Sequence, residues 1–248
     1  MKLPPELRNK IYGECLRDND AIYLIDSQAS YRRTAVRATL QRWKNCTRKH
    51  DRGWRWGDAD ASRYKAKPMT DTLKPLSPHL LSVSKAVYAE AANVLYGQPI
   101  VVVDNVTLFN FASTMTPRTA AMLRNITVAF WCHTAAHRQM NYAAMTLLAA
   151  VGAVHLDRLN LDCRLRPYGA SGDLVARRVY RDCYSWILAV GVAKAENLAA
   201  LDMLQMGDVN FHAWQDQRPP EMRKADIEKN RKLFQKELKR LIQRGAQF

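Results

Sequence analysis

Short runs of apolar and β-branched residues alternate along the chain with longer segments whose apolar residues recur every three or four positions. The short runs predict strands at residues 21–25, 100–103, 126–130, 156–161 and 198–204. The longer segments predict helices at residues 80–96, 142–151 and 178–194. Because strands that alternate with helices pair in parallel through right-handed crossovers, we expect an α/β fold. Its last four strands should form one parallel sheet with the intervening helices on one face.

Two of these strands are approached through a similar pattern of apolar residues. Leu156, Leu159 and Leu161 follow a Leu-x-x-Leu-x-Leu spacing, and residues 122–128 follow a close variant of it. The strand spacing of about 35 to 40 residues is longer than that of a standard leucine-rich repeat. Residues 98–217 are therefore predicted to form an irregular strand-helix solenoid that is leucine-rich-repeat-like.

The first 16 residues predict a short amphipathic helix. Pro4 and Pro5 stand in its first turn, where a missing N–H costs no intrahelical hydrogen bond. Gly13 weakens the helix by up to ~1 kcal/mol relative to alanine, so the helix should depend on a partner surface within the chain or on another protein. The apolar residues of its stripe recur every four positions, and they are Leu3, Leu7, Ile11 and Cys15.

Charge is concentrated in two segments of this 248-residue chain, which has a formal net charge of +15. Residues 31–67 hold twelve Lys or Arg against three Asp, and residues 221–244 hold nine against four acidic residues. The remainder is close to neutral, so the basic segments are expected to have partners of their own. The predicted organisation is a helical module at 1–16 and 68–97, a partly disordered basic insertion at 17–67, the repeat domain at 98–217 and a basic amphipathic helix at 218–248.

The basic insertion interleaves cations with tryptophans, a composition that suits phosphate contacts combined with base stacking. A solvated basic loop whose tryptophans pack back onto the body is the alternative interpretation. The candidate nucleic-acid-binding residues are Arg42, Trp43, Lys44, Arg48, Lys49, Arg52, Trp54, Arg55 and Trp56.

Residues 3–12, LPPELRNKIY, and residues 80–97, LLSVSKAVYAEAANVLYG, together resemble the F-box-like family of filamentous fungi. Members of that family pair these two helices. The resemblance implies an N-terminal helical docking module that binds the small Skp-type adaptor of a cullin-RING ubiquitin ligase. The partner-binding residues that it implies are Leu3, Pro4, Leu7, Ile11 and Cys15. The same motif could instead serve only as a structural cap on the body.

The sequence offers only weak signals for catalytic or metal-binding residues. His133 and His137 have the i, i+4 spacing of a zinc pair, but Thr134 stands where a metalloprotease has its glutamate. Cys163 lacks an evident base, so a core cysteine is the simpler interpretation. The five scattered cysteines form no C-x-x-C pair, which indicates a reducing compartment. We expect no catalytic residue, no metal and no cofactor.

The chain is therefore interpreted as a non-enzymatic interaction adaptor that binds a protein substrate and is located in the cytoplasm or nucleus. No membrane span is expected, since the longest weakly polar stretch, residues 143–154, is shorter than the ~20 residues that cross a bilayer. The main alternative is a nucleic-acid or ribonucleoprotein binder that uses the basic insertion and the C-terminal helix. A fungal effector or an enzyme of unfamiliar fold is a third hypothesis.

Overall fold

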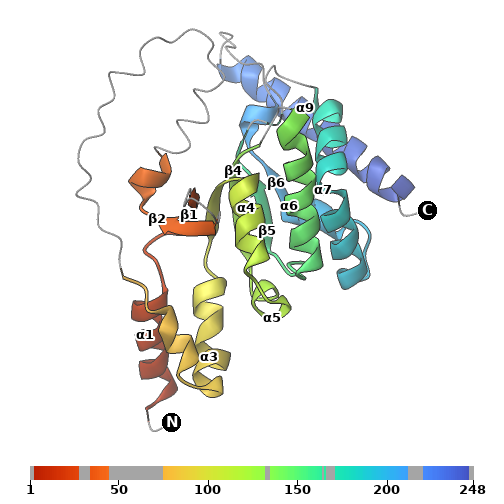
Figure 1. The fold of residues 1–248 in the computed structure, drawn as a ribbon. Coiled ribbons are helices and arrows are strands. Elements are labelled where there is room, and N and C mark those ends of the chain that lie inside the picture. Colours follow the sequence, from red (N-terminus) through yellow and green to blue (C-terminus); the bar gives the residue numbers. More distant parts are fainter. Residues whose placement is uncertain are drawn as a thin grey trace.

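The computed structural model describes residues 3–27, 34–44, 75–131, 135–163, 165, 171–211 and 220–245. Within these residues the chain forms a mixed α/β structure around one six-stranded sheet (Figure 1). The strands are β1 (Ile22–Ser27), β2 (Thr34–Ala38), β3 (Ile100–Asp104), β4 (Asn125–Phe130), β5 (Arg158–Leu161) and β6 (Leu204–Met206). Their order in the sheet is β2-β1-β3-β4-β5-β6.

All neighbouring strands pair in parallel except β2, which pairs antiparallel with β1. From β1 to β6 each parallel strand lies beside the next one along the chain, so the order never reverses. The predicted parallel sheet is confirmed. β1 and β2 lie within residues 17–67, and both belong to the sheet although that segment was predicted to be an insertion.

Helices α4 (Asn105–Ser113), α6 (Ala135–Ala150), α7 (Gly172–Lys194) and α9 (Pro220–Gly245) pack consecutively, each against the next. Figure 1 shows α4, α6 and α7 side by side on one side of the sheet. Shorter elements lie between these helices and strands along the chain: α5 (Pro117–Ala120), α8 (Ala199–Met203) and the 3-10 turn η2 (Asp208–Asn210). Asp104 begins α4 directly after β3, because its carboxylate accepts hydrogen bonds from the Thr107 amide and hydroxyl, both at 2.8 Å.

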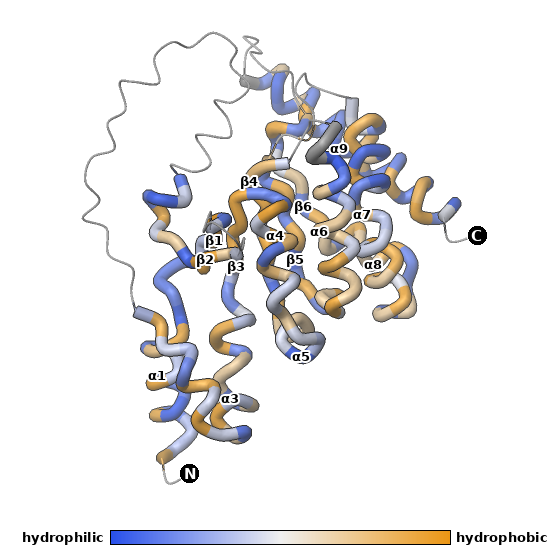
Figure 2. The backbone as a smooth tube through the Cα atoms, viewed as in Figure 1, coloured by the Kyte–Doolittle hydropathy of each residue, from blue (hydrophilic) through white to orange (hydrophobic). Residues whose placement is uncertain are grey.

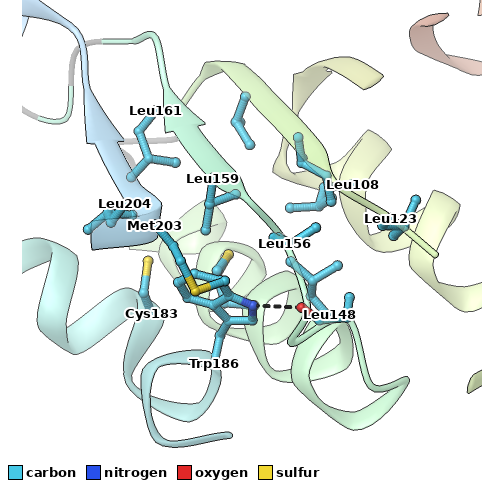
Figure 3. Packing of buried hydrophobic residues seen from close by; sticks show 14 of the residues in the cluster. Leu108, Leu123, Leu148, Leu156, Leu159, Leu161, Cys183, Trp186, Met203 and Leu204 are labelled. Atoms are coloured by element: carbon cyan, nitrogen blue, oxygen red, sulfur yellow. Dashed lines mark hydrogen bonds between the residues drawn. The ribbon is translucent and has the colours of Figure 1, made fainter. Parts of the chain in front are cut away.

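The core lies between the sheet and this helical layer. Residues of alternate strand positions point into it, and successive strands align them in register as Ile100, Ile126, Leu159 and Leu204, each less than a tenth exposed. Figure 3 shows Trp186 of α7 gathered with Leu159 and Leu204 in this core. The indole N–H of Trp186 donates to the Ala153 carbonyl at 3.0 Å, so the buried polar group is satisfied.

The remaining elements are a helix pair, α1 (Pro5–Leu16) and α3 (Lys85–Tyr96), and the 3-10 turn η1 (Pro78–Ser82) beside it. They project from the end of the sheet at which β1 and β3 begin (Figure 1). The helix predicted over residues 80–96 is divided, since Ser84 caps α3 by accepting a hydrogen bond from the Val87 amide at 3.2 Å.

The strand predicted over residues 198–204 is wrong for most of its length. Residues 199–203 form helix α8, and the strand β6 begins only at Leu204. Ala199, Ala200 and Met203 are buried together, which is the spacing of one helical face. A short apolar run of this kind does not distinguish helix from strand by periodicity, and its alanines favour the helix.

Candidate interaction surfaces

The outer face of α1 carries an exposed row of apolar side chains. Leu7 is 49% exposed and Ile11 is 43% exposed, Leu3 just before the helix is 49% exposed, and we call these three residues the apolar stripe. Pro4, which precedes the helix, is also exposed. Figure 2 shows orange, hydrophobic residues and blue, hydrophilic residues mixed along α1. Cys15, the last residue predicted for this stripe, is instead half-buried and packs against the core.

The opposite face of α1 is already occupied. Tyr12 is 4% exposed and Leu16 is fully buried, both within the main core cluster. The Arg8 guanidinium donates to both carboxylate oxygens of Glu90 on α3, at 2.9 and 3.0 Å. The Tyr12 hydroxyl donates to the same carboxylate at 3.1 Å. These contacts fix which face of α1 points outward.

Charge and burial at this junction shift two ionisation equilibria. The hydrogen bond from Arg8 lowers the pKa of Glu90 because it stabilises the carboxylate. Burial, followed by the nearby Glu90 carboxylate, raises the pKa of Tyr12, so its hydroxyl stays a hydrogen-bond donor. The Glu90 carboxylate therefore stays ionised at neutral pH and keeps accepting these hydrogen bonds.

Gln98 ties the ends of the two helices together. Its buried side chain donates to the carbonyls of Leu16 and Leu95, both at 2.9 Å, and accepts from the Asp18 amide at 2.8 Å. The orphan carbonyls at two helix ends are thus satisfied by one carboxamide. The helix pair is therefore held by Glu90 within α3 and by Gln98 at the C-terminal ends of both helices.

Trp43, one of the three tryptophans predicted to stack on bases, packs within the fold. Trp43 packs against the buried cluster of Ile25, Ala38 and Val103, and its ring lies 5.4 Å from that of Tyr23. Its neighbours Arg42 and Lys44 are exposed. The other predicted members of this site lie outside the described residues, and they are Arg48, Lys49, Arg52, Trp54, Arg55 and Trp56.

The sheet face that points away from the helical layer carries a row of polar side chains. Thr127, Asn160 and Gln205 are in register on β4, β5 and β6. Among the described residues their side chains make no hydrogen bond or ion pair, nor do those of Asn125 and Arg158. The row lines a shallow groove of about 460 Å³ bounded by Pro99, Asn125, Ile126, Thr127, Asp157, Arg158, Asn160 and Gln205. The groove was not predicted from the sequence, although Thr127 and Asn160 stand at outward positions of two predicted strands.

A buried polar network lies between the ends of β3 and β4 and the helical layer. The Trp131 indole donates to Asp182 at 3.0 Å, and the Arg181 guanidinium donates to the same carboxylate at 2.7 Å. Asn105 donates to Asn141 at 2.6 Å, and Asn141 contacts Asp182 in turn. The bonds of Trp131, Asn105 and Asn141 each link two segments of the fold, whereas Arg181 lies beside Asp182 on α7, so the buried part of the network fixes the helices against one another and against the end of β4.

The cysteines in this region are unsuited to nucleophilic chemistry. Burial raises the pKa of the Cys183 thiol well above its ordinary value, so the thiol stays protonated. Cys163 is also buried. Among the described residues no group of three metal-ligating side chains occurs, and His133 of the histidine pair lies outside them. In the same part of the chain no helix is long and apolar enough to cross a membrane.

Comparison with known proteins identifies one family. Residues 1–147 match the family described as Domain of unknown function (DUF7730), which is more than half of the chain. The matched region contains the helix pair, β1 to β4 and most of α6. No curated protein and no solved structure matches the chain.

Proposed function

We propose that the chain, which belongs to the DUF7730 family, is a non-enzymatic protein-interaction adaptor that docks a partner through the apolar stripe of α1. The observation that carries this proposal is the exposure of Leu3, Leu7 and Ile11 on a helix whose other face is already packed. A helix that served only to cap the body would bury its apolar stripe. Here Tyr12 and Leu16 perform the packing, and the stripe is left for a second surface.

The stripe is large enough to contribute useful affinity. Full burial of a leucine or isoleucine side chain is worth about 1.5–3 kcal/mol, and each residue of the stripe is nearly half exposed. Covering all three would therefore contribute roughly 2–4 kcal/mol, or about two orders of magnitude in affinity. The helix pair is fixed by Glu90 and Gln98, so little conformational entropy is lost on docking.

The partner suggested by the sequence resemblance is the Skp-type adaptor of a cullin-RING ubiquitin ligase. The two segments that carry the resemblance belong to α1 and to η1–α3, and these elements pack together although residues 17–77 separate them. This pairing supports an F-box-like helical module at residues 1–16 and 68–97. The chain would then be a substrate receptor of the ligase.

The body offers a second surface for the protein substrate. The unreversed strand order and the consecutive packing of α4, α6 and α7 support a leucine-rich-repeat-like solenoid, one sheet face of which the described helices leave uncovered. The groove at Thr127, Asn160 and Gln205 lies on this face. Its three side chains carry hydrogen-bonding groups that have no partner among the described residues. Carboxamides and hydroxyls both donate and accept, which suits a peptide backbone.

The proposal is tested with the double variant Leu7→Asp, Ile11→Asp and a purified Skp-type adaptor. We expect the parent to bind the adaptor and the variant to lose binding at least tenfold, because two charges would be buried in the interface. The melting temperature should change little, since both side chains already face solvent. The matched control is Val192→Asp, Met222→Asp, which places the same charges at exposed apolar residues outside α1.

Two outcomes contradict the proposal. A parent that does not bind the adaptor, with a double variant that melts far below the control, would assign α1 a capping role. A variant that binds as tightly as the parent would move the docking site away from the stripe.

A further inference from the structure

Helix α9 has an inner face that is fully used by the fold. Phe234, Leu238 and Ile242 are each less than 5% exposed and belong to the main core. They lie on the side that packs along α7. Figure 1 shows α9 at the end of the molecule opposite to α1. The apolar face of this amphipathic helix is therefore unavailable to any further partner.

The outer face of α9 is a row of lysines. Lys229, Lys232, Lys236 and Lys239 are all exposed, and we call them the lysine ridge. Their spacings of three, four and three residues keep them on one side of the helix. At a rise of 1.5 Å per residue the ridge extends for about 15 Å along the axis.

The acidic residues of α9 do not neutralise the ridge. Glu237 lies to one side of the ridge, where it accepts hydrogen bonds from Arg240 at 2.6 Å and from Arg177 of α7 at 3.1 Å. These bonds, that to Arg240 above all, lower the pKa of Glu237 to about 2, so its charge is committed to the two arginines. Within the part of the chain that the structure describes, Lys232 is the one lysine of the ridge that forms an ion pair, with Glu228 at 3.6 Å.

The other three lysines of the ridge, Lys229, Lys236 and Lys239, have no ion-pair partner among the described residues. Like charges three or four residues apart on a helix repel each other and lower its stability. A line of phosphates would relieve this repulsion, and it would release bound counterions as it did so. The charge of the ridge is thus complementary to that of a linear polyanion.

We propose that the lysine ridge binds the phosphate backbone of a nucleic-acid duplex without reading its bases. Lysine contacts phosphate as a point charge and carries no sequence information in that role. A single strand is the weaker fit, because the ridge has no aromatic side chain on which bases could stack. A membrane surface is also a weaker fit, because the apolar face that would enter the lipid is packed on α7.

This inference goes beyond the adaptor function and does not depend on it. The apolar stripe and the lysine ridge lie on α1 and α9, at opposite ends of the molecule (Figure 1). Loss of duplex binding would leave adaptor docking untouched, and loss of docking would leave the ridge untouched.

The experiment compares two fourfold variants of the full chain. The ridge variant is Lys229→Gln, Lys232→Gln, Lys236→Gln, Lys239→Gln. The control variant is Lys10→Gln, Arg17→Gln, Lys85→Gln, Lys194→Gln, which removes four charges at exposed positions outside α9. Binding to a labelled 20-base-pair duplex is followed by fluorescence anisotropy between 50 and 200 mM KCl, and circular dichroism verifies that both variants fold.

We expect the ridge variant to bind the duplex at least tenfold more weakly than the parent at 50 mM KCl. Its slope of log K against log salt should be shallower by about 3 to 4, since each phosphate contact contributes about 0.9. The control variant should keep most of the parental slope. A single strand of the same sequence should bind the parent no more tightly than the duplex.

Three results would overturn the inference. A parent that shows no duplex binding at 50 mM KCl has no such site. Equal losses in both variants would attribute binding to net charge alone. Tighter, ridge-dependent binding to phosphatidylserine vesicles than to the duplex would assign the ridge to a lipid surface.

Discussion

Arg8 and Glu90 are 82 residues apart in the sequence and join α1 to α3 through two parallel hydrogen bonds, at 2.9 and 3.0 Å. This planar, two-armed geometry is the one in which arginine binds a carboxylate most specifically. Because Tyr12 donates to the same carboxylate, Glu90 receives three hydrogen bonds in all. The orientation of the apolar stripe on the far side of α1 follows from this contact.

The stability contributed by Glu90 should depend on pH. Its folded pKa lies below the usual 4.5, so its contribution is complete above that value and is lost as pH falls through the lowered pKa. The variant Glu90→Gln should therefore melt below the parent at pH 7, and the difference should shrink at pH 3. Thermal unfolding of both proteins at the two pH values measures this. A difference that is the same at both would show that the carboxylate charge is irrelevant.

The C-terminal end of α7 stores a local strain that a single substitution can remove. Ala195 has φ +52° and ψ +28°, the left-handed conformation that disfavours side chains with a Cβ. Ala195→Gly should stabilise the protein by about 1 kcal/mol, which corresponds to roughly 2–4 °C in melting temperature. The neighbouring Ala193→Gly, at an exposed position within α7, should have the opposite sign and a similar size. If both substitutions shifted the melting temperature in the same direction, the strain assigned to Ala195 would be contradicted.

Glycine is required where α7 and α9 cross. A Cβ on Gly172 would collide with the Asn230 carbonyl oxygen and would lie 2.7 Å from the Phe234 amide nitrogen, both backbone atoms. Gly172→Ala should therefore displace α9 and cost several kcal/mol, a loss at the upper end for single substitutions. Gly13→Ala meets no atom within 4 Å and should instead stabilise α1 by up to ~1 kcal/mol. Chemical denaturation of both variants tests the contrast, and equal stabilities would contradict it.

Local sequence patterns predicted the parts of the fold that local physics determines. The β-branched run at residues 100–103 is buried on the core side and forms β3 as expected. Helix α4 was missed because it follows β3 without a loop, although Asp104 and Thr107 have the spacing of a helix cap. β2 was missed because it is a short strand, TAVRA, which pairs only with β1 at the edge of the sheet.

The candidate surfaces were predictable to the extent that they follow helical periodicity. A spacing of four residues advances by about 40° per step on a helix of 3.6 residues per turn. The row that is exposed at Leu7 and Ile11 has therefore turned towards the core by Cys15, which is half-buried. Contacts across long separations, such as that of Arg8 with Glu90, have no local signal in the sequence.

Trp43 separates the two interpretations of the basic segment that follows β2. Its ring covers Ile25 and Val103 on the sheet and lies 5.4 Å from Tyr23, so it acts as a packing residue. Trp43→Ala should therefore lower stability by about 1–3 kcal/mol, less than the 3–5 of a fully buried aromatic residue because the ring is only half-buried. The paired substitution Arg42→Gln, Lys44→Gln should leave stability within about 0.5 kcal/mol, since both side chains are exposed. Urea denaturation of the three proteins measures these differences. If Trp43→Ala kept full stability and instead weakened binding to a single-stranded oligonucleotide, the ring would serve as a stacking platform after all.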